Sequence, residues 1–480
     1  ASRAFHGLEI RGWRCGADGV GLRLHLLRPQ GACAAPRTAG WPCSWSLPQE
    51  HWISREVQLV FAPFGARSSP GPWSSIWKVA TRGVVSNISS SPGLLLTDAV
   101  CAESSAGGLL VLDGVEGASE AAAVAIMAPM LRSRSGEAIA LSIAVPLSVV
   151  LDTLLDDPAC QSALSPEELQ CLARLDLCLP PSPVLQQARE GVALLWLDSG
   201  SWASAVVLST EGHLLTCAHL LTGSSWMEPR KDGSSPPRPR VHQPCHGRCL
   251  VHAEGTTVTA TFEAEVLHVF EGFLDAALLV AKPSRTGVWK FNPSLWQRQS
   301  LVKEGTKVWA VGHGLFGPGS PWQGPAVTCG QLAKVVWGRH RAAVLQSSAA
   351  VHRGCSGGAL VAAETGELLG MVTTNAKQQD GGVLPHINFI LPVGLLAPLF
   401  TYLRNVKEPT ALRTLIEDLQ ASAADPEEQG VWRLESEHLV LPSRMAARKY
   451  HVLESLDELE KLAGNEVQNE KDRPDQLSKL

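Results

Sequence analysis

The sequence predicts a mainly β protein made of two barrel-containing halves and a helical C-terminal tail. Short apolar runs punctuated by glycine, proline and valine fill most of the chain, a pattern typical of antiparallel sandwiches and barrels. A glycine-rich segment of the first half recurs in altered form in the second half. From Leu403 onward the chain becomes charged and helical in pattern.

The composition is that of a globular chain. Its 480 residues are 45% hydrophobic with a mean hydropathy of +0.05, enough for a large core and for about three folded units. The net charge of −5 provides no global basic field for nucleic acid, and no apolar run of about 18 residues predicts a membrane span. Twelve scattered cysteines and the lack of an opening signal segment favour reduced thiols in an intracellular compartment. The first residue, Ala1, indicates a processed end or a fragment boundary.

The first half is expected over residues 1–178. Its predicted strands are residues 59–64, 80–86, 93–97, 108–112 and 121–128. A helical stretch is expected at about 147–178, where SPEELQCLARL opens with a serine N-cap and early glutamates. A further barrel would have to lie in residues 1–53, which contain no recognisable histidine motif, so we expect this half to be incomplete at its N-terminus.

The second half is expected over residues 189–402, after a proline-rich linker at 179–188. Within it, a Ser, Pro and Arg-rich insertion at 222–250 is expected to form a mobile surface loop. Residues 403–480 are expected to form the helical tail, a surface-packing element whose LDELEKLAG segment is a candidate for self-association.

Three segments of the second half predict nucleophilic catalysis. LLTCAHLL supplies His219 at the end of an apolar strand, EGFLDAALLVAK supplies Asp275 at the entry of another, and RGCSGGAL supplies Ser356. A serine hydroxyl attacks at neutral pH when a histidine takes its proton and a carboxylate orients that histidine. Each segment alone is more often structural, but the three in this order and context predict a His, Asp, Ser triad.

Two further features would complete such a site. Glycines around the serine allow a tight turn that aims the backbone N–H groups of Gly354 and Ser356 at a developing oxyanion. The following strand, GELLGMVTTNA, would line a substrate pocket with Thr373, Thr374 and Asn375. A small polar pocket of this kind suits a small residue such as cysteine before the scissile bond.

These segments, together with INFILPVGLL, resemble the trypsin-like protease domain of the HtrA/Deg group over residues 189–402. The resemblance implies a double β-barrel fold and a serine endopeptidase that needs no cofactor or metal. Cys355 stands where asparagine is common in the group, which changes local packing but keeps the backbone donor. No PDZ-like module is expected, because too few residues follow Tyr402.

The first half carries a copy of the nucleophile segment without its nucleophile. DAVCAESSAGGLLV (98–111) aligns without a gap with SAAVHRGCSGGALV (348–361), and Ala106 stands where Ser356 stands. Alanine can neither attack nor give a proton, so this copy cannot perform acyl transfer by that route. Ser104 and Ser105 lie at the wrong places on the turn. The first half is therefore predicted to be a degenerate, inactive trypsin-like half that packs against the active one or presents substrate.

The last three residues, Ser478, Lys479 and Leu480, form the tripeptide typical of a peroxisomal address. Together with the triad they make the chain similar to peroxisomal members of this protease class. That resemblance implies a matrix enzyme that removes N-terminal targeting leaders from imported precursors, cleaves near cysteine and cleaves itself between its halves. An import receptor would be a partner, as would further copies of the chain; nucleic acid is not expected as one.

Other polar residues favour simpler interpretations. A compact zinc site is conceivable in HQPCHGRC, but ligands so closely spaced in a Ser and Pro-rich loop more often bind nothing; its members are His242, Cys245, His246 and Cys249. The basic residues of the same insertion favour a solvated face over a docking site; they are Arg230, Lys231, Arg238 and Arg240. His352 favours a substrate-facing place over a catalytic one. The rival to an enzyme is a peroxisomal binding protein or chaperone that has kept the protease fold.

Overall fold

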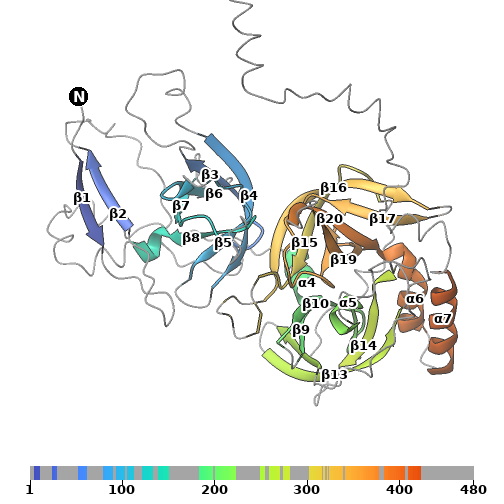
Figure 1. Ribbon diagram of the computed structural model, residues 1–480. Coiled ribbons are helices and arrows are strands. Elements are labelled where there is room, and N and C mark those ends of the chain that lie inside the picture. The colour runs from blue at the N-terminus through green and yellow to red at the C-terminus, as the bar shows by residue number, and fades with distance from the viewer. Residues whose placement is uncertain are drawn as a thin grey trace, which may run out of the picture. The chain divides into compact units, whose positions relative to one another are not determined.

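The computed structural model of the chain (Figure 1) describes it in segments separated by gaps. The described residues are 5–10, 24–29, 52–61, 79–89, 93–102, 105–112, 122–132, 139–150, 183–197, 200–222, 249–254, 259–270, 274–281, 302–315, 317–318, 320, 322, 324–338, 341–377, 383–405 and 409–422. All of them belong to one compact unit that ends at Trp432. Residues 433–480 are a second unit and lie outside the described segments.

Three closed six-stranded antiparallel barrels make up most of the described chain. The N-terminal barrel has the strand order β3 (Glu56–Phe61), β4 (Val79–Ile88), β5 (Leu95–Thr97), β8 (Ser142–Pro146), β7 (Ala122–Met127) and β6 (Leu109–Leu112). The histidine barrel has the order β10 (Trp202–Val207), β11 (His213–Thr216), β14 (Ala277–Ala281), β13 (Thr259–Val269), β12 (Cys249–Glu254) and β9 (Val192–Leu197). The serine barrel has the order β15 (Lys307–Gly312), β16 (Ala326–Trp337), β17 (Ala342–Ser347), β20 (Val383–Pro392), β19 (Leu368–Lys377) and β18 (Ala359–Ala362).

The strands form because alternating or continuous apolar residues face the barrel interiors. In β3, Val57 and Leu59 are buried while Glu56 is exposed. Two strands of the histidine barrel, VALLWL in β9 and ALLVA in β14, are apolar on every residue, and their side chains belong to a cluster that also includes neighbouring elements. The N-terminal barrel and the serine barrel each enclose a cluster of buried side chains, and a third cluster joins the histidine barrel to one side of the serine barrel. The prediction of a mainly β chain is confirmed.

The N-terminal barrel and the serine barrel share one strand order. The first strand of each pairs with the second and the fourth, and the closing strands follow in the same sequence. The predicted strands of the first half agree with β3 to β7 within a few residues. Closer to the N-terminus, the described residues add a two-stranded sheet of β1 (Phe5–Ile10) and β2 (Leu24–Pro29).

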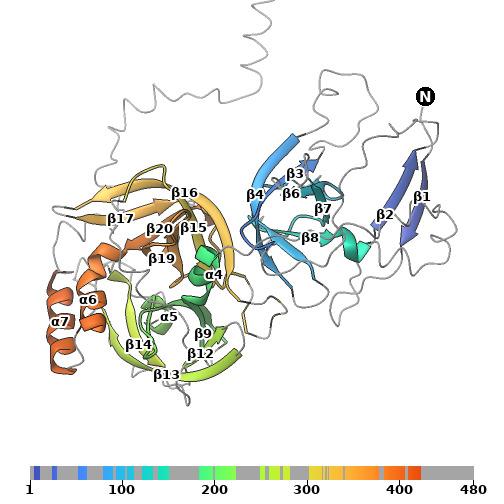
Figure 2. The ribbon, with the colours of Figure 1, turned by 180° about the vertical axis from the view of Figure 1, so that it is seen from behind.

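The sequence suggested a linker at 179–188, but Pro183–Glu190 form a helix, α4. Proline is well suited to the first helical position because its missing N–H has no intrahelical partner there. Leu185 and Ala188 of α4 are buried in the core of the histidine barrel. The helix contacts both β9 and β15, and Figure 2 shows it where these two barrels meet.

The other helices lie after strands. The short α5 (His219–Thr222) follows β11, and the 3₁₀ helix η7 (Val393–Leu396) follows β20. It leads into α6 (Ala397–Asn405), which packs beside α7 (Pro409–Ser422) as Figures 1 and 2 show. Leu399 and Leu419 carry this pair onto the core of the histidine barrel. No helix within the described segments is long and apolar enough to cross a membrane.

Candidate active site

His219 and Asp275 are brought together by the histidine barrel. His219 opens α5 just after β11, and Asp275 lies just before β14, the strand that pairs with β11. The Nδ1 atom of His219 lies 2.8 Å from Oδ2 of Asp275, and the backbone N–H of His219 donates to Oδ1 at 3.0 Å. Two bonds to one carboxylate fix both the backbone and the ring of the histidine.

The electrostatics of the pair favour a basic histidine. Burial lowers the pKa of His219, but the hydrogen bond and the charge of Asp275 outweigh it and leave the pKa raised above its ordinary value. Asp275 has a φ of 38°, a left-handed conformation that is unfavourable for a residue with a side chain. Such strain is typical of functional positions, where the surrounding structure holds the residue in place.

Ser356 lies in a tight turn between β17 and β18. The N–H of Cys355 donates to the carbonyl of His352 at 2.9 Å, and the N–H of Gly358 donates to the carbonyl of Cys355 at 2.8 Å. Gly354 and Gly357 have φ values of 99° and 81°, which glycine alone adopts without strain. Within the described part of the chain, no protein acceptor takes the N–H of Gly354 or of Ser356, so both are available to an oxyanion.

Ser204 of β10 connects this turn to the histidine barrel. Its N–H donates to the carbonyl of Ser356 at 2.8 Å, and its hydroxyl donates to the carbonyl of Gly354 at 2.8 Å. The same hydroxyl accepts the N–H of His313 at 2.8 Å. A side chain on Gly357 would collide with the Ser204 carbonyl. Sequence reasoning missed Ser204, because a lone serine in the apolar strand WASAVV gives no local signal of such contacts.

Trp202, two residues earlier on the same strand, is a second residue that the sequence did not reveal. Its indole N–H donates to the carbonyl of His313 at 3.2 Å. The guanidinium of Arg353 lies 5.8 Å from the centre of its ring, within the range of a cation–π contact. A side chain on Gly354 would meet the same indole. Trp202 therefore covers the nucleophile turn from the side of the histidine barrel.

The hydroxyl of Ser356 donates to the carbonyl of Thr373 at 3.0 Å, rather than to His219. The two side chains nevertheless come from elements in contact. Thr216, three residues before His219, donates its hydroxyl to the Ser204 carbonyl at 2.7 Å, and Gly357 packs against both groups. The Ser356 hydroxyl would have to leave the Thr373 carbonyl before it could donate to His219.

The three predicted pocket residues lie on β19, which borders Ser356. Thr373 is 1% exposed and donates its hydroxyl to the carbonyl of Phe389 at 2.8 Å, so it contributes mainly its backbone. Thr374 is exposed. The Asn375 amide donates to the carbonyl of Val351 at 2.6 Å, which ties the strand to the segment leading to the nucleophile.

His352 and Cys217 lie close to the site without the features of a base or a metal ligand. Burial and the neighbouring His386 lower the pKa of His352 to about 4, so its ring is neutral near pH 7. Cys217 lies near His219 and Asp275, a grouping that could hold a metal ion. Burial and the charge of Asp275 raise the pKa of its thiol, which donates to the carbonyl of Val372 at 3.3 Å. The thiol is therefore protonated near pH 7 and hydrogen-bonded within the protein.

Several predicted residues cannot be placed. The C-terminal tripeptide, the LDELEKLAG segment and the insertion with its basic residues and His242, Cys245 and His246 lie outside the described residues. Cys249 is the first residue of β12. Ser105 of the N-terminal barrel is 1% exposed and accepts the N–H of Ala102 at 2.7 Å, a structural role.

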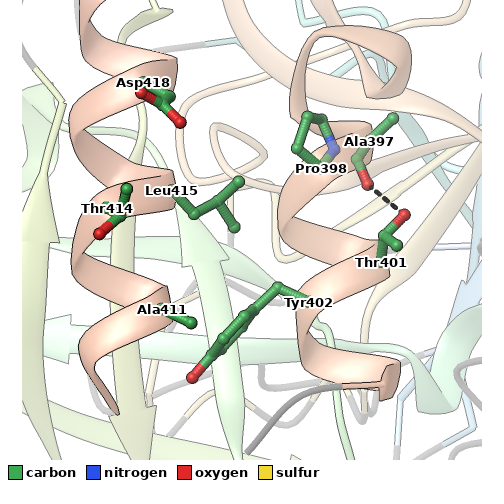
Figure 3. A pocket seen from close by; sticks show the side chains of 8 residues that line it. All are labelled: Ala397, Pro398, Thr401, Tyr402, Ala411, Thr414, Leu415 and Asp418. Atoms are coloured by element: carbon green, nitrogen blue, oxygen red, sulfur yellow. Dashed lines mark hydrogen bonds between the residues drawn. The ribbon is translucent and has the colours of Figure 1, made fainter. Parts of the chain in front are cut away.

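A groove of about 770 Å³ lies between α6 and α7, away from all the residues discussed above (Figure 3). It is lined by Ala397, Pro398, Thr401, Tyr402, Ala411, Thr414, Leu415 and Asp418. Leu415 and Tyr402 point into the space between the helices, whereas the Thr401 hydroxyl donates to the carbonyl of Ala397 at 3.1 Å. None of the residues predicted for catalysis lines this groove.

A protein-family model matches the part of the chain that contains the residues of this site. Residues 203–371 match the model of the trypsin-like peptidase domain. The match begins in β10 beside Ser204, includes His219, Asp275 and Ser356, and ends in β19. The second half of the chain is thus similar to a trypsin-like peptidase domain, and the N-terminal barrel repeats the strand order of its serine barrel.

Two curated relatives carry names that are more specific than that of the family model. Over 133 residues, 28% of this chain, the sequence is 38% identical to the peroxisomal leader peptide-processing protease of Homo sapiens, of which the match covers 22%. The Mus musculus protein of the same name is 38% identical over 113 residues, 23% of this chain and 19% of the relative. The matched stretch therefore spans about a fifth of each relative. Among solved structures, the HtrA-type protease AlgW with tripeptide is 24% identical, with 46% of this chain and 62% of that chain covered and a TM-score of 0.33.

Proposed function

We propose that the chain is a peroxisomal serine endopeptidase that removes N-terminal targeting leaders from imported matrix enzymes. The observation that carries the catalytic part is the His219–Asp275 pair, held beside a glycine turn that presents Ser356. The trypsin-like domain match and the names of the curated relatives support the class of reaction and the type of substrate. Cleavage near cysteine and self-cleavage between the halves belong to the same proposal.

The reaction begins with the proton of Ser356. Asp275 accepts Nδ1–H of His219 and so leaves Nε2 as the proton acceptor. When substrate enters, the Ser356 hydroxyl turns from the Thr373 carbonyl toward Nε2. Its oxygen then bonds to the scissile carbonyl carbon while its proton passes to His219, and the carbonyl π electrons move onto oxygen.

The backbone completes the first half of the reaction. The N–H groups of Gly354 and Ser356 receive the oxyanion that forms on the substrate. His219 gives its proton to the leaving amine, and the peptide C–N bond breaks to leave an acyl ester on Ser356. Water activated by the same histidine then hydrolyses the ester and restores the serine. No step requires a cofactor or a metal.

The location and the partners follow from the same proposal. The relatives' names place proteins of this kind in peroxisomes, and the sequence predicts Ser478, Lys479 and Leu480 as the signal that an import receptor binds. In cells lacking an intact copy, the full chain should colocalise with a peroxisomal marker and a chain without these three residues should stay in the cytosol. Peroxisomal import of the shortened chain would contradict this part of the proposal.

The catalytic part is tested with a fluorophosphonate probe and with precursors. We expect one covalent adduct per chain, mapped by mass spectrometry to Ser356, because only an activated nucleophile reacts with the probe at an appreciable rate. Purified chain incubated with leader-bearing precursors should give new N-termini next to cysteine. Labelling at a residue other than Ser356 would overturn the proposed site. Precursors left intact by an enzyme that the probe labels would overturn the proposed substrate.

One observation favours a second candidate, a binding protein that keeps the protease fold. The Ser356 hydroxyl donates to a backbone carbonyl and not to His219. Catalytic hydrogen bonds are often loose before substrate binds, so this geometry does not exclude catalysis. An unlabelled chain that still binds leader peptides would establish the binding function instead.

A further inference from the structure

The N-terminal barrel packs against the serine barrel through equivalent strands, β4 and β16. Thr81 donates its hydroxyl to the carbonyl of Val100 at 2.7 Å, and Thr328 donates to the carbonyl of Ala350 at the same distance. These two bonds occupy matching places in the two barrels. Glu56 and Lys307, which open the first strand of each barrel, form an ion pair with one another.

Asp98 stands in the first of the two matching segments where Ser348 stands in the second. Its counterpart, Ser348, accepts the N–H of Gln331 within the serine barrel at 2.9 Å. Asp98 accepts the corresponding N–H, that of Val84, with Oδ1 at 2.6 Å. Its second oxygen reaches across and accepts the N–H of Cys329 in β16, also at 2.6 Å.

Asp98 is costly to bury. It is 7% exposed, and burial raises its pKa to about 6, although its backbone hydrogen bonds act in the opposite direction. A buried carboxylate is expensive unless it is well bonded, and serine is sufficient for the bond inside a barrel, as Ser348 demonstrates. The extra oxygen of Asp98 therefore serves the contact between the two barrels.

The same contact extends to a loop that we call the bridging loop, described at residues 313–315, 317–318, 320, 322 and 324–325. Asn87 of β4 donates its amide to the carbonyl of Gly324 at 3.2 Å, and Ser89 forms an isolated β-bridge with Trp322. Apolar side chains from both sides close this region into one cluster. Its members are Leu96, Leu131, Ile139, Leu141 and Ile143 of the N-terminal barrel, with Leu315, Trp322 and Ala326.

On its other side the bridging loop holds the nucleophile turn. Leu315, which contributes to the shared cluster, has a φ of 66° and donates its N–H to the carbonyl of Arg353 at 2.9 Å. Gly314 packs so closely on the turn that an added Cβ would lie 2.6 Å from Sγ of Cys355. A side chain on Gly354 would collide with the carbonyl of His313. Any displacement of the loop therefore changes the position of the backbone around Gly354.

We propose that the N-terminal barrel, which lacks a nucleophile, is a built-in activating module: it fixes the bridging loop and β16 so that the turn around Ser356 keeps the geometry that catalysis needs. Asp98 is its main positioning residue. The proposal rests on the proposed protease function and adds a role for the inactive half. It explains why an inactive barrel retains a buried carboxylate directed at its active neighbour.

The sharpest test is Asp98→Ser in the full chain, because it installs the residue that the serine barrel uses at the same place. The variant keeps an acceptor for Val84 and removes only the bond to Cys329. We expect kcat to fall about tenfold with KM within about twofold, since small displacements of reacting groups cost rate before they cost binding. The rate of fluorophosphonate labelling of Ser356 should fall in parallel.

Two further variants make the test decisive. Ser105→Ala removes a hydrogen bond inside the N-terminal barrel, that to Ala102, without touching the contact between barrels, and should leave kcat unchanged. Asn87→Asp keeps the side-chain acceptor for Ile88 but loses the donor to Gly324, and should lower kcat about threefold. If thermal unfolding shows that Asp98→Ser does not fold, the kcat of Asn87→Asp tests the proposal instead.

The outcomes separate this inference from the function on which it rests. Unlabelled wild-type chain would remove the protease function itself. If the probe labels the wild-type chain but the folded Asp98→Ser and Asn87→Asp variants keep the wild-type kcat, only the activating role of the N-terminal barrel is overturned. An equal loss in Ser105→Ala would also overturn it, because the effect would then be general destabilisation of the barrel.

Discussion

The turn around Ala106 in the N-terminal barrel and the turn around Ser356 in the serine barrel have the same backbone. In the first, the N–H of Ser105 donates to the carbonyl of Ala102 and that of Gly108 donates to the carbonyl of Ser105, at 3.0 and 2.9 Å. Cys355 and Gly358 make the corresponding bonds at 2.9 and 2.8 Å. Gly107 and Gly357 have φ values of 82° and 81°. The two turns therefore share these backbone features although one carries Ala106 where the other carries Ser356.

The surroundings of the two turns differ. A side chain on Gly357 would collide with Ser204 and lie 2.5 Å from the Thr216 hydroxyl, because the histidine barrel covers the turn. A side chain on Gly107 would have nothing within 4 Å, and Ala106 is exposed. The same turn thus occurs in both barrels, but only the turn around Ser356 is covered by a second barrel that brings the His219–Asp275 pair and Ser204.

The largest effect should come from exchanging the nucleophile between the two turns. Ser356→Ala should reduce peptide cleavage by on the order of 10⁴ or more while the chain stays folded, because the attacking oxygen is lost. Ala106→Ser, alone or combined with Ser356→Ala, should restore nothing, since no described histidine and carboxylate pair faces Ala106.

The measurements are kcat/KM on a peptide substrate and probe labelling. Full cleavage by Ser356→Ala would remove the triad assignment. Probe labelling at residue 106 of the Ala106→Ser variant would show that the N-terminal barrel is less degenerate than its sequence indicates.

Replacing Gly107 or Gly357 with alanine should show how much the cover by the histidine barrel matters for kcat. Both have a left-handed φ, so each substitution carries a local strain of about 1 to 2 kcal/mol. Only Gly357→Ala also pushes against Ser204, which must move the turn, and we expect kcat to fall by at least about 10². Gly107→Ala should leave kcat within about twofold. Equal kinetic effects would show that the cover by the histidine barrel does not matter for rate.

The sequence predicted the parts of this site that are local. Glycines at the turn and apolar flanks around His219 and Asp275 identify themselves in short segments, and the repeat revealed the inactive copy. The contacts that assemble the parts could not be predicted, because Ser204 and Trp202 look like ordinary strand residues and their bonds to Gly354 and His313 join positions more than 100 residues apart. The sequence showed Asp98 only as the first residue of the segment with Ala106 in place of Ser356, and it did not reveal the bond to the distant Cys329.

The pH dependence should identify the pair that the N-terminal barrel lacks. His219 must be neutral to accept the proton, and its pKa is raised, so kcat/KM should fall about tenfold per pH unit below a pKa that lies above 6.5. Asp275→Asn removes the carboxylate hydrogen bond and the negative charge that raise the pKa of His219. Burial of the ring, which lowers that pKa, remains. The acid limb should then move to lower pH and the maximum should fall sharply.

Asp98→Ser is the matched control for this profile, because it removes a buried carboxylate whose pKa is raised by burial and which lies outside the His219–Asp275 pair. Its acid limb should stay where that of the wild type lies. An acid limb that followed Asp98 and ignored Asp275 would mean that the profile reports the contact between barrels and not the base.

The smallest effect should come from the two equivalent threonines, and it distinguishes a shared structural bond from a functional one. Thr81→Val and Thr328→Val each keep the side-chain shape and remove a hydroxyl donor that lies 2.7 Å from its carbonyl, at a cost of roughly 1 kcal/mol. Thr328 is buried at 4% exposure, so its substitution also leaves the carbonyl of Ala350 without this donor.

Hydrogen exchange of the backbone should therefore increase in residues 98–111 of Thr81→Val and in residues 348–361 of Thr328→Val. Only Thr328→Val should lower kcat as well, by a few fold, because Ala350 leads into the turn that carries Ser356. If Thr81→Val lowered kcat as much without faster exchange in 348–361, the two turns would be coupled through a route other than β16 and the bridging loop.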